Sequence, residues 1–303
     1  MPEPVIETSG LTKDYGDVRA VDDLDLRIPA GTVFGLLGPN GAGKTTIIGT
    51  LLGLIRPTRG TVRLFGSDTT GSTDAAVRRI GAIMETPAFY PFLSGRDNLR
   101  YFQGISGVAD EGEIDRLLDV VGLAGRGGDR FNTYSLGMKH RLGIAYALLG
   151  DPEVLLLDEP TNGLDPAGMA EVRSLLRRLG TGERTIVLAS HLLNEVEQVC
   201  DQVAILARGR VVAEGEVREI IGRRERFRLT TTDDAAARTV LESVEWIDSV
   251  VAEADGLLVE APEDRAGDVS RTLAAAGIYP TRLLQITTSL EQYFLEVTGE
   301  DGS

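Results

Sequence analysis

The sequence is poor in cysteine, lysine and aromatic residues. Its 303 residues include one cysteine, Cys200, three lysines, and aromatic side chains at 5% of positions. A single cysteine forms no internal disulfide, which is typical of a reducing compartment. Residues 1–4 lack the apolar segment of a secretory signal. The longest apolar-rich stretch, residues 47–55, is about half as long as a membrane-spanning helix requires. We therefore expect a cytosolic chain that needs another chain for any work in the membrane.

Basic residues are also too few to balance the acidic ones. The chain has 31 Lys and Arg against 46 Asp and Glu, a formal net charge of −15. Domains that bind DNA or RNA usually show a basic footprint, because they neutralise backbone phosphates. We therefore expect no nucleic-acid partner. The hydrophobic fraction of 42% is enough for a substantial core, which excludes collagen-like and disordered chains.

Two patterns divide the chain near residue 221. In residues 1–221, short apolar runs such as 33–37 and 154–157 alternate with helical patterns, which predicts an α/β domain with buried parallel strands. Before residue 30, apolar and polar residues alternate, which indicates a sheet with one solvent-exposed face. Residues 222–303 alternate between strand and helix patterns and contain 8 arginines against 16 acidic residues. They predict a small, acidic α+β accessory domain.

A glycine-rich segment between an apolar strand and a helix predicts a phosphate site. Residues 38–45 match G-x-x-x-x-G-K-[ST], in which backbone N–H groups surround the β-phosphate. Lys44 would reach the β- and γ-phosphate oxygens, and the Thr45 hydroxyl would bind Mg²⁺. The predicted phosphate-binding residues are Gly38, Pro39, Asn40, Gly41, Ala42, Gly43, Lys44, Thr45 and Thr46.

Two carboxylates follow a second apolar strand. Asp158 and Glu159 end the run 154–157, at the sheet edge where the glycine-rich loop is also expected. Asp158 would hold Mg²⁺ through water, and Glu159 would orient and polarise an attacking water. Paired acids at a strand end are commonly only solvated, but behind a phosphate loop we predict a catalytic role.

Further motifs follow in a fixed order. Residues 134–139 read Tyr-Ser-Leu-Gly-Met-Lys and are similar to the L-S-G-G-Q signature of the ATP-binding cassette (ABC) family, with leucine at one glycine position. With these motifs, residues 4–220 resemble the nucleotide-binding subunit of an ABC transporter. The resemblance implies that Ser135 and Gly137 contact the γ-phosphate held by an opposite protomer. Ser135 is also a good N-cap for the following helix, so a purely structural role stays open.

The same resemblance implies roles for three other residues. Residues 160–166 resemble the D-loop, in which Asp165 would communicate across the dimer. His191 closes a strand and resembles the switch histidine that touches the γ-phosphate. Tyr15 resembles the aromatic residue that stacks on adenine, although packing on its own sheet is an alternative. We expect the other histidine, His140, on the surface of the signature helix.

One position departs from the common family pattern. After the strand 80–84, most members carry a glutamine that ligates Mg²⁺ and meets the membrane subunit, whereas this chain has Glu85. Residues 85–91 resemble the variant in exporters of lantibiotics, bacitracin-like peptides and other antibiotics. A carboxylate here would add a charge near the metal. A solvated surface glutamate is the alternative.

The resemblance also implies a helical subdomain, about residues 88–140, that docks on the membrane partner. It holds a cluster of aromatic residues whose role as interface or as core stays open. The cluster comprises Phe89, Tyr90, Phe92, Tyr101 and Phe102. The acidic tail resembles the C-terminal extension of drug-exporter ATPases, which braces the dimer or regulates it.

Together these features predict an α/β P-loop NTPase domain of the ABC type, with an antiparallel β subdomain and a helical subdomain. We expect a homodimeric ATPase that uses ATP and Mg²⁺ and lies at the cytoplasmic face of the cell membrane. It would power a separately encoded integral membrane permease that exports an antibiotic, peptide or other drug. These assignments follow from the resemblance.

Three other functions fit the sequence less well. ABC ATPases that act on nucleic acid have long coiled coils or two cassettes in one chain, whereas Lys44 and Ser135 lie 91 residues apart without heptads. An ABC importer ATPase shares every catalytic residue, and only Glu85 and the tail argue against it. A GTPase is disfavoured because the guanine-reading N-K-x-D segment is absent.

Overall fold

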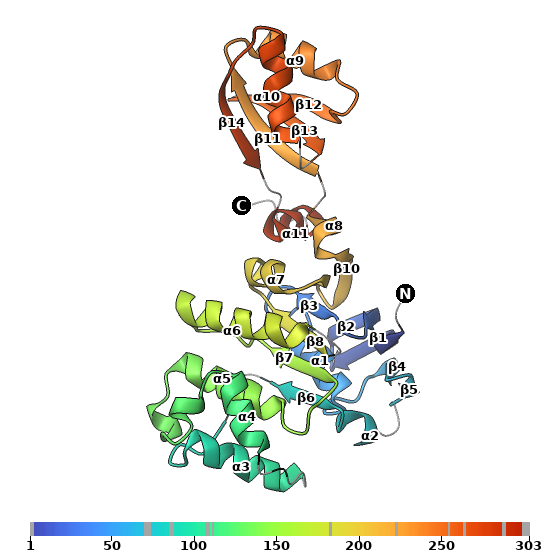
Figure 1. Cartoon of the computed structure of the whole chain (residues 1–303). Coiled ribbons are helices and arrows are strands. Elements are labelled where there is room, and N and C mark those ends of the chain that lie inside the picture. The colour runs from blue at the N-terminus through green and yellow to red at the C-terminus, as the bar shows by residue number, and fades with distance from the viewer. Residues whose placement is uncertain are drawn as a thin grey trace. The chain divides into compact units, whose positions relative to one another are not determined.

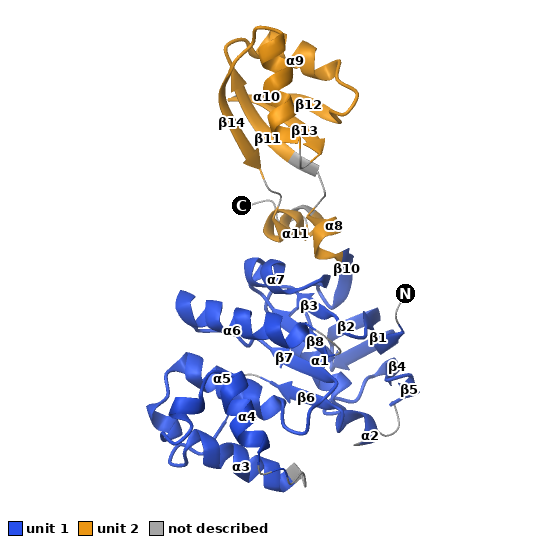
Figure 2. Cartoon of the chain, in the orientation of Figure 1, with its two compact units in different colours: residues 1–215 blue, residues 216–303 orange. Residues whose placement is uncertain are grey.

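The chain forms two compact units, Met1–Gly215 and Glu216–Ser303 (Figure 2). The computed structural model describes residues 3–69, 74–84, 88–106, 110, 112–181, 184–221, 224–253, 255–262, 265–286 and 289–298. Among the described helices, none combines the length and the hydrophobicity that a membrane crossing requires. Each unit has a hydrophobic core of its own.

The first unit is built on a six-stranded sheet in the order β10-β9-β3-β8-β7-β6 (Figure 1). Its strands are β3 (Val33–Leu37), β6 (Ile80–Ile83), β7 (Val154–Asp158), β8 (Thr185–Ser190), β9 (Gln202–Ala207) and β10 (Arg210–Glu216). Strands β6, β7, β8, β3 and β9 pair in parallel. Every residue of β3, β7 and β8 is buried, as the continuous apolar runs predict for strands covered on both faces.

A second, antiparallel sheet packs into the same core. It has the order β2-β1-β4-β5 and consists of β1 (Pro4–Tyr15), β2 (Val18–Pro29), β4 (Arg59–Leu64) and β5 (Ser67–Asp68). In β2 the residues Leu24, Leu26 and Ile28 are buried and their neighbours Asp25 and Arg27 are exposed. The expected sheet with one solvent-exposed face is therefore confirmed.

The helices of this unit are α1 (Lys44–Leu51), α2 (Asp74–Val77), α3 (Gly95–Ser106), α4 (Glu113–Val120), α5 (Leu136–Ala147), α6 (Pro166–Gly180) and α7 (Leu193–Val199), with 3-10 turns at Ala124–Arg126 and Phe131–Thr133. Some of them pack on the parallel strands, whereas α3 and α4 pack on α5 and on each other (Figure 1). Helix α1 starts directly after the glycine-rich loop, α5 after Ser135 and α6 after Asp165.

The aromatic cluster is half-buried in one part and exposed in the other. The rings of Phe89 and Phe102 pack edge to face, with centroids 5.7 Å apart, and Phe102 also lies 5.0 Å from the ring of Tyr146. Phe92 is instead 77% exposed, and Tyr90 and Tyr101 are about half exposed. The cluster thus combines half-buried rings that pack on one another with an exposed aromatic surface.

A glycine lets the signature helix approach the sheet. A Cβ on Gly81 of β6 would lie 1.7 Å from the carbonyl oxygen of Ala147, the last residue of α5. No side chain fits in that space, so only glycine allows α5 to pack this closely on β6. The approach positions α5, and with it the segment that begins at Ser135.

The second unit is an α+β sandwich with an antiparallel sheet in the order β12-β13-β11-β14. Its elements are α8 (Val217–Ile220), β11 (Arg224–Thr231), α9 (Asp234–Glu242), β12 (Ser249–Glu253), β13 (Gly256–Pro262), α10 (Ala266–Ala275), β14 (Pro280–Ile286) and α11 (Leu290–Thr298). Strand β12 is not predicted from the sequence, because this edge strand buries only Val250 and shows no full alternation of buried and exposed residues.

We predict that Gly81→Ala destabilises the protein by about 2–3 kcal/mol, because the new Cβ collides with the backbone of Ala147. Gly104→Ala is the matched control: no atom lies within 4 Å of the Cβ position at this helical glycine. The control should gain about 0.5–1 kcal/mol. Urea unfolding followed by circular dichroism measures both. A Gly81→Ala protein as stable as the wild type would contradict the packing described for α5.

Candidate functional site

The glycine-rich loop holds a buried lysine at the start of α1. Lys44 is 6% exposed, and its Nζ donates to the carbonyl oxygens of Gly38 at 2.6 Å and Pro39 at 3.3 Å. Its Nζ also lies 3.5 Å from Oε1 of Glu159. The loop therefore wraps around the ammonium group, which is fixed at the loop's centre.

Two loop glycines are required by their surroundings. Gly43 has φ of 104°, a left-handed conformation that side chains disfavour, and its Cβ would lie 2.5 Å from the carbonyl oxygen of Ala20. A Cβ on Gly38 would lie 2.5 Å from the carbonyl oxygen of Leu206. The loop thus runs in close contact with β2 on one side and β9 on the other.

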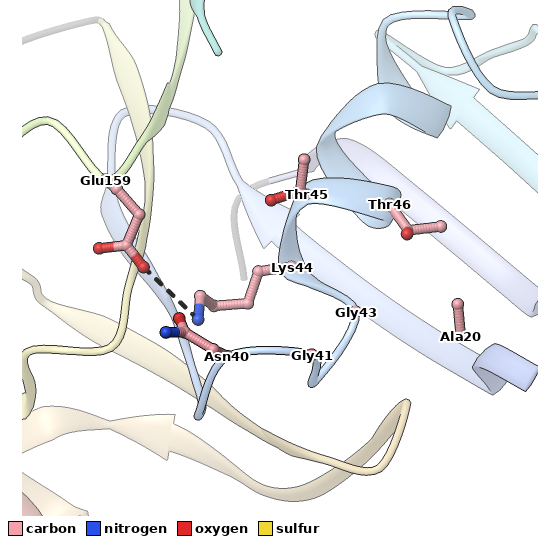
Figure 3. A pocket seen from close by; sticks show the side chains of 8 residues that line it. All are labelled: Ala20, Asn40, Gly41, Gly43, Lys44, Thr45, Thr46 and Glu159. Atoms are coloured by element: carbon pink, nitrogen blue, oxygen red, sulfur yellow. Dashed lines mark ion pairs between the residues drawn. The ribbon is translucent and has the colours of Figure 1, made fainter. Parts of the chain in front are cut away.

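A pocket of about 250 Å³ opens over this loop. Figure 3 shows its lining, with Glu159 across the pocket from Lys44 and a dashed line for their ion pair. The lining residues are Ala20, Asn40, Gly41, Gly43, Lys44, Thr45, Thr46 and Glu159. No local sequence pattern marks Ala20 as a site residue, because only the folding of β2 against the loop brings it to the pocket.

The two carboxylates after β7 have different environments. Asp158 is 2% exposed, and its Oδ2 accepts a hydrogen bond of 2.7 Å from the hydroxyl of Thr45. Glu159 has φ of 50°, which is uncommon for a residue with a side chain, and its N–H donates to the carbonyl of Ala189 at 2.9 Å. Such backbone strain persists only where surrounding structure maintains it, and it clusters at functional sites.

His191 completes the cluster. Its Nδ1 lies 2.9 Å from Oε2 of Glu159, whose other oxygen faces Lys44. Three residues far apart in sequence thus meet, because β3, β7 and β8 are parallel neighbours whose carboxyl ends share one edge. The carboxylate between a cation and an imidazole can accept a proton from water beside a bound phosphate chain.

The oxygen atoms beside the pocket fit a divalent cation. Mg²⁺ is usually bound by one or two carboxylates together with substrate phosphates and waters. The Thr45 hydroxyl and the Asp158 carboxylate, already in contact, are donors of this kind. The described ranges contain no group of three or more His, Cys, Asp or Glu that could hold a metal. Glu85, the third predicted metal ligand, lies outside the described residues.

The signature segment and the D-loop lie against each other. A Cβ on Gly137 would be 3.8 Å from Cα of Gly168 and 4.0 Å from the side chain of Leu164. Ser135 caps α5 by accepting from the N–H of Met138 at 3.3 Å, and Asp165 caps α6 by accepting from Gly168 at 2.9 Å. Neither cap residue is among the described residues that line the pocket over Lys44.

Tyr15 ends β1, at the hairpin to β2. Its backbone pairs with Val18, and its side chain is 48% exposed rather than buried in its own sheet. It is not one of the described residues that line the pocket. Ala20, two residues beyond Val18 on β2, is one of them.

The expected surface position of His140 is wrong. His140 is 5% exposed and forms a hydrogen bond with the backbone of Pro160, which has no N–H and therefore accepts. Burial lowers the pKa of its imidazole below the usual 6.5, and the bond to Pro160 opposes this. The prediction failed because α5 is buried on more than one side. His140 thus supports the backbone directly after Glu159.

A parallel sheet, a glycine-rich loop around a buried lysine, and an acid pair on the neighbouring strand define a P-loop nucleoside triphosphatase. The ABC transporter family model matches residues 21–162. The chain belongs to the family of ATP-binding subunits of ABC transporters, which confirms the resemblance drawn from the motifs. It is an ATPase, and its hydrolysis of ATP is coupled to transport.

Its relatives cover nearly the whole chain. The chain is 38% identical over 302 residues to the bacitracin transport ATP-binding protein BcrA of Enterococcus faecalis, covering 99% of this chain and 98% of that one. It is 37% identical to the daunorubicin/doxorubicin resistance ATP-binding protein DrrA of Streptomyces peucetius, covering 98% and 93%. A solved ATP-binding subunit of an ABC transporter superimposes with a TM-score of 0.63 at 30% identity, covering 71% and 91%. The predicted fold class is therefore confirmed.

We predict that His140→Gln reduces the loss of stability in acid. The pKa of His140 is lower in the folded protein than in the unfolded chain. Below about pH 6.5 the unfolded chain therefore binds more protons than the folded protein, and the wild type loses stability. Above about pH 6.5 the imidazole is neutral in both states, so it causes no such loss. The melting temperature should therefore fall less between about pH 7.5 and about pH 5.5 in the variant. Equal falls in both proteins would show that His140 does not cause the effect.

Proposed function

We propose that two copies of this chain form the ATPase of an exporter and bind ATP between them. The observation that carries the proposal is the position of the Glu159 carboxylate, 3.5 Å from Nζ of Lys44 and 2.9 Å from Nδ1 of His191, over the phosphate loop. The signature residues Ser135 and Gly137 are not part of this pocket lining. If they contact nucleotide, a second copy must present them.

Each residue of the cluster then has a separate task. The loop N–H groups and Lys44 bind the phosphates, and Thr45 and Asp158 would hold Mg²⁺, which supplies positive charge to the developing transition state. Glu159 orients the attacking water and takes up its proton. His191 contacts Oε2 of Glu159, the oxygen that does not face Lys44, and we assign it a contact with the γ-phosphate.

Residues of the partner copy and the hairpin complete the site in this proposal. Ser135 and Gly137 would approach the γ-phosphate through the start of α5, where helix N–H groups favour an anion. Asp165, at the start of α6, would couple the two ATP sites of the dimer to each other. Tyr15 would stack on the adenine, and its half-exposed ring is available for this contact.

The membrane partner is a separately encoded integral permease. The exposed aromatic surface beside α3, with Phe92 77% exposed and Tyr90 and Tyr101 about half exposed, is the surface that we assign to its docking. Docking there would hold the chain at the cytoplasmic face of the membrane. Movement of the helices on ATP binding and hydrolysis would then be transmitted to the permease.

The transported compound belongs to the antibiotic and drug class. Relatives that match nearly the whole chain are named for bacitracin transport and for daunorubicin and doxorubicin resistance. Glu85, in place of the usual glutamine, also supports export, because residues 85–91 resemble the variant in antibiotic exporters. We therefore propose an export ATPase rather than an importer or a nucleic-acid ATPase.

Glu159→Gln is expected to bind ATP but to hydrolyse it at least about 100-fold more slowly than the wild type, because an amide does not accept the proton of water. ATP should then trap the dimer, which gel filtration with light scattering detects. Glu153→Gln is the control: Glu153 lies just before β7 and pairs with Arg79 at the surface. Full hydrolysis by Glu159→Gln, or a wild type that hydrolyses ATP fully while monomeric, would overturn the proposal.

Glu85→Gln is expected to retain nucleotide binding and to weaken the coupling of hydrolysis to export. The measurement compares drug export per ATP hydrolysed in the complex with the membrane protein that co-purifies with this chain. Resistance to the exported drug should disappear with Glu159→Gln and decrease with Glu85→Gln. If Glu85→Gln exports as much drug per ATP hydrolysed as the wild type, Glu85 has no role in coupling.

A further inference from the structure

We propose that Lys13 is a positioning residue for the nucleotide base. It covers one face of the Tyr15 ring, so that a purine stacks only on the opposite face. The inference rests on the proposed contact between Tyr15 and adenine. Lys13 belongs neither to the family motifs nor to the described residues that line the phosphate pocket.

The contact between the two side chains carries the proposal. Nζ of Lys13 lies over the Tyr15 ring, 4.8 Å from its centroid. This separation is within the range of about 6 Å in which an ammonium group is attracted to an aromatic face. The ring is otherwise 48% exposed, so it retains surface that a planar base can cover.

The ammonium is anchored rather than mobile. Nζ of Lys13 donates to the carbonyl oxygen of Arg56 at 2.9 Å. The adjoining backbone is fixed too, because the N–H of Asp14 donates to the Thr58 hydroxyl at 2.9 Å and the N–H of Thr58 donates to the carbonyl of Thr12 at 2.8 Å. The segment before β4 therefore supports Lys13, and Lys13 restricts the orientations of the ring.

The hairpin places this pair beside the phosphate pocket. Tyr15 pairs with Val18, and Ala20, two residues or about 7 Å further along β2, lines the pocket. The carbonyl of Ala20 is the atom that a Cβ on Gly43 would strike at 2.5 Å. A base joined to a diphosphate in the loop can therefore reach the Tyr15 ring, and an ordered ring loses less entropy when the base binds.

The test compares a nucleotide with a probe that lacks the base, using the full chain. ADP is the nucleotide, since it is not hydrolysed further at this site, and pyrophosphate is the base-free probe. Lys13→Met should weaken ADP binding about two- to fivefold, as calorimetry measures, and should leave the inhibition constant of pyrophosphate unchanged. Lys13→Arg should bind ADP within about twofold of the wild type, because a guanidinium also covers a ring face.

The control variant alters the same hairpin without touching the Tyr15 ring. Arg19 pairs with Asp14 at 2.8 Å, so Arg19→Gln removes a hairpin contact of similar kind and should change neither affinity. In a Tyr15→Ala background, adding Lys13→Met should have no further effect. This non-additivity separates a role through Tyr15 from a general effect on folding.

Three results would overturn the inference: unchanged ADP affinity in Lys13→Met, equal weakening of ADP and pyrophosphate, or the same loss with and without Tyr15. Failure of the underlying assignment looks different. If Tyr15→Ala binds ADP as tightly as the wild type, the adenine contact itself is wrong. If Tyr15→Ala loses affinity and Lys13→Met does not, only the role of Lys13 is excluded.

Discussion

The site depends on one carboxylate held between a lysine ammonium and a histidine imidazole at a strained turn. Glu159 adopts a left-handed backbone conformation directly after β7, and its oxygens meet Lys44 on one side and His191 on the other. Strain of this kind costs roughly 1–3 kcal/mol, so the surroundings must maintain it. They do so through the bond from Glu159 to Ala189 and the contact of His140 with Pro160.

The parallel sheet explains why these groups meet. Strands β3, β8 and β7 are neighbours, and the loop after each one carries a part of the site. Because these strands are fully buried, packing in the core fixes their positions. The polar side chains that follow each strand are therefore held in fixed positions as well. The close contact of Gly81 with Ala147 fixes α5 against the same sheet, and the first turn of α5 carries the signature residues.

Family membership and geometry support different parts of the conclusion. The relatives establish an ATP-binding subunit of an ABC transporter along nearly the whole chain. The structure adds how this chain's own residues are arranged, including the separation of Ser135 from the pocket over Lys44. That separation is the physical reason to propose two copies at each ATP, and the exposed aromatic surface is the reason to propose a docked permease.

The sequence by itself determined the features that local patterns encode. The phosphate loop, the acid pair after a buried strand and the alternation in β2 all depend on residues close together in the chain, so spacing predicts them. Tertiary structure alone decided the burial of His140, the edge strand β12, the place of Ala20 in the pocket and the contact of Lys13 with Tyr15 and Arg56. Burial and close approach depend on elements brought together from distant parts of the chain, and periodicity along one segment does not describe its neighbours.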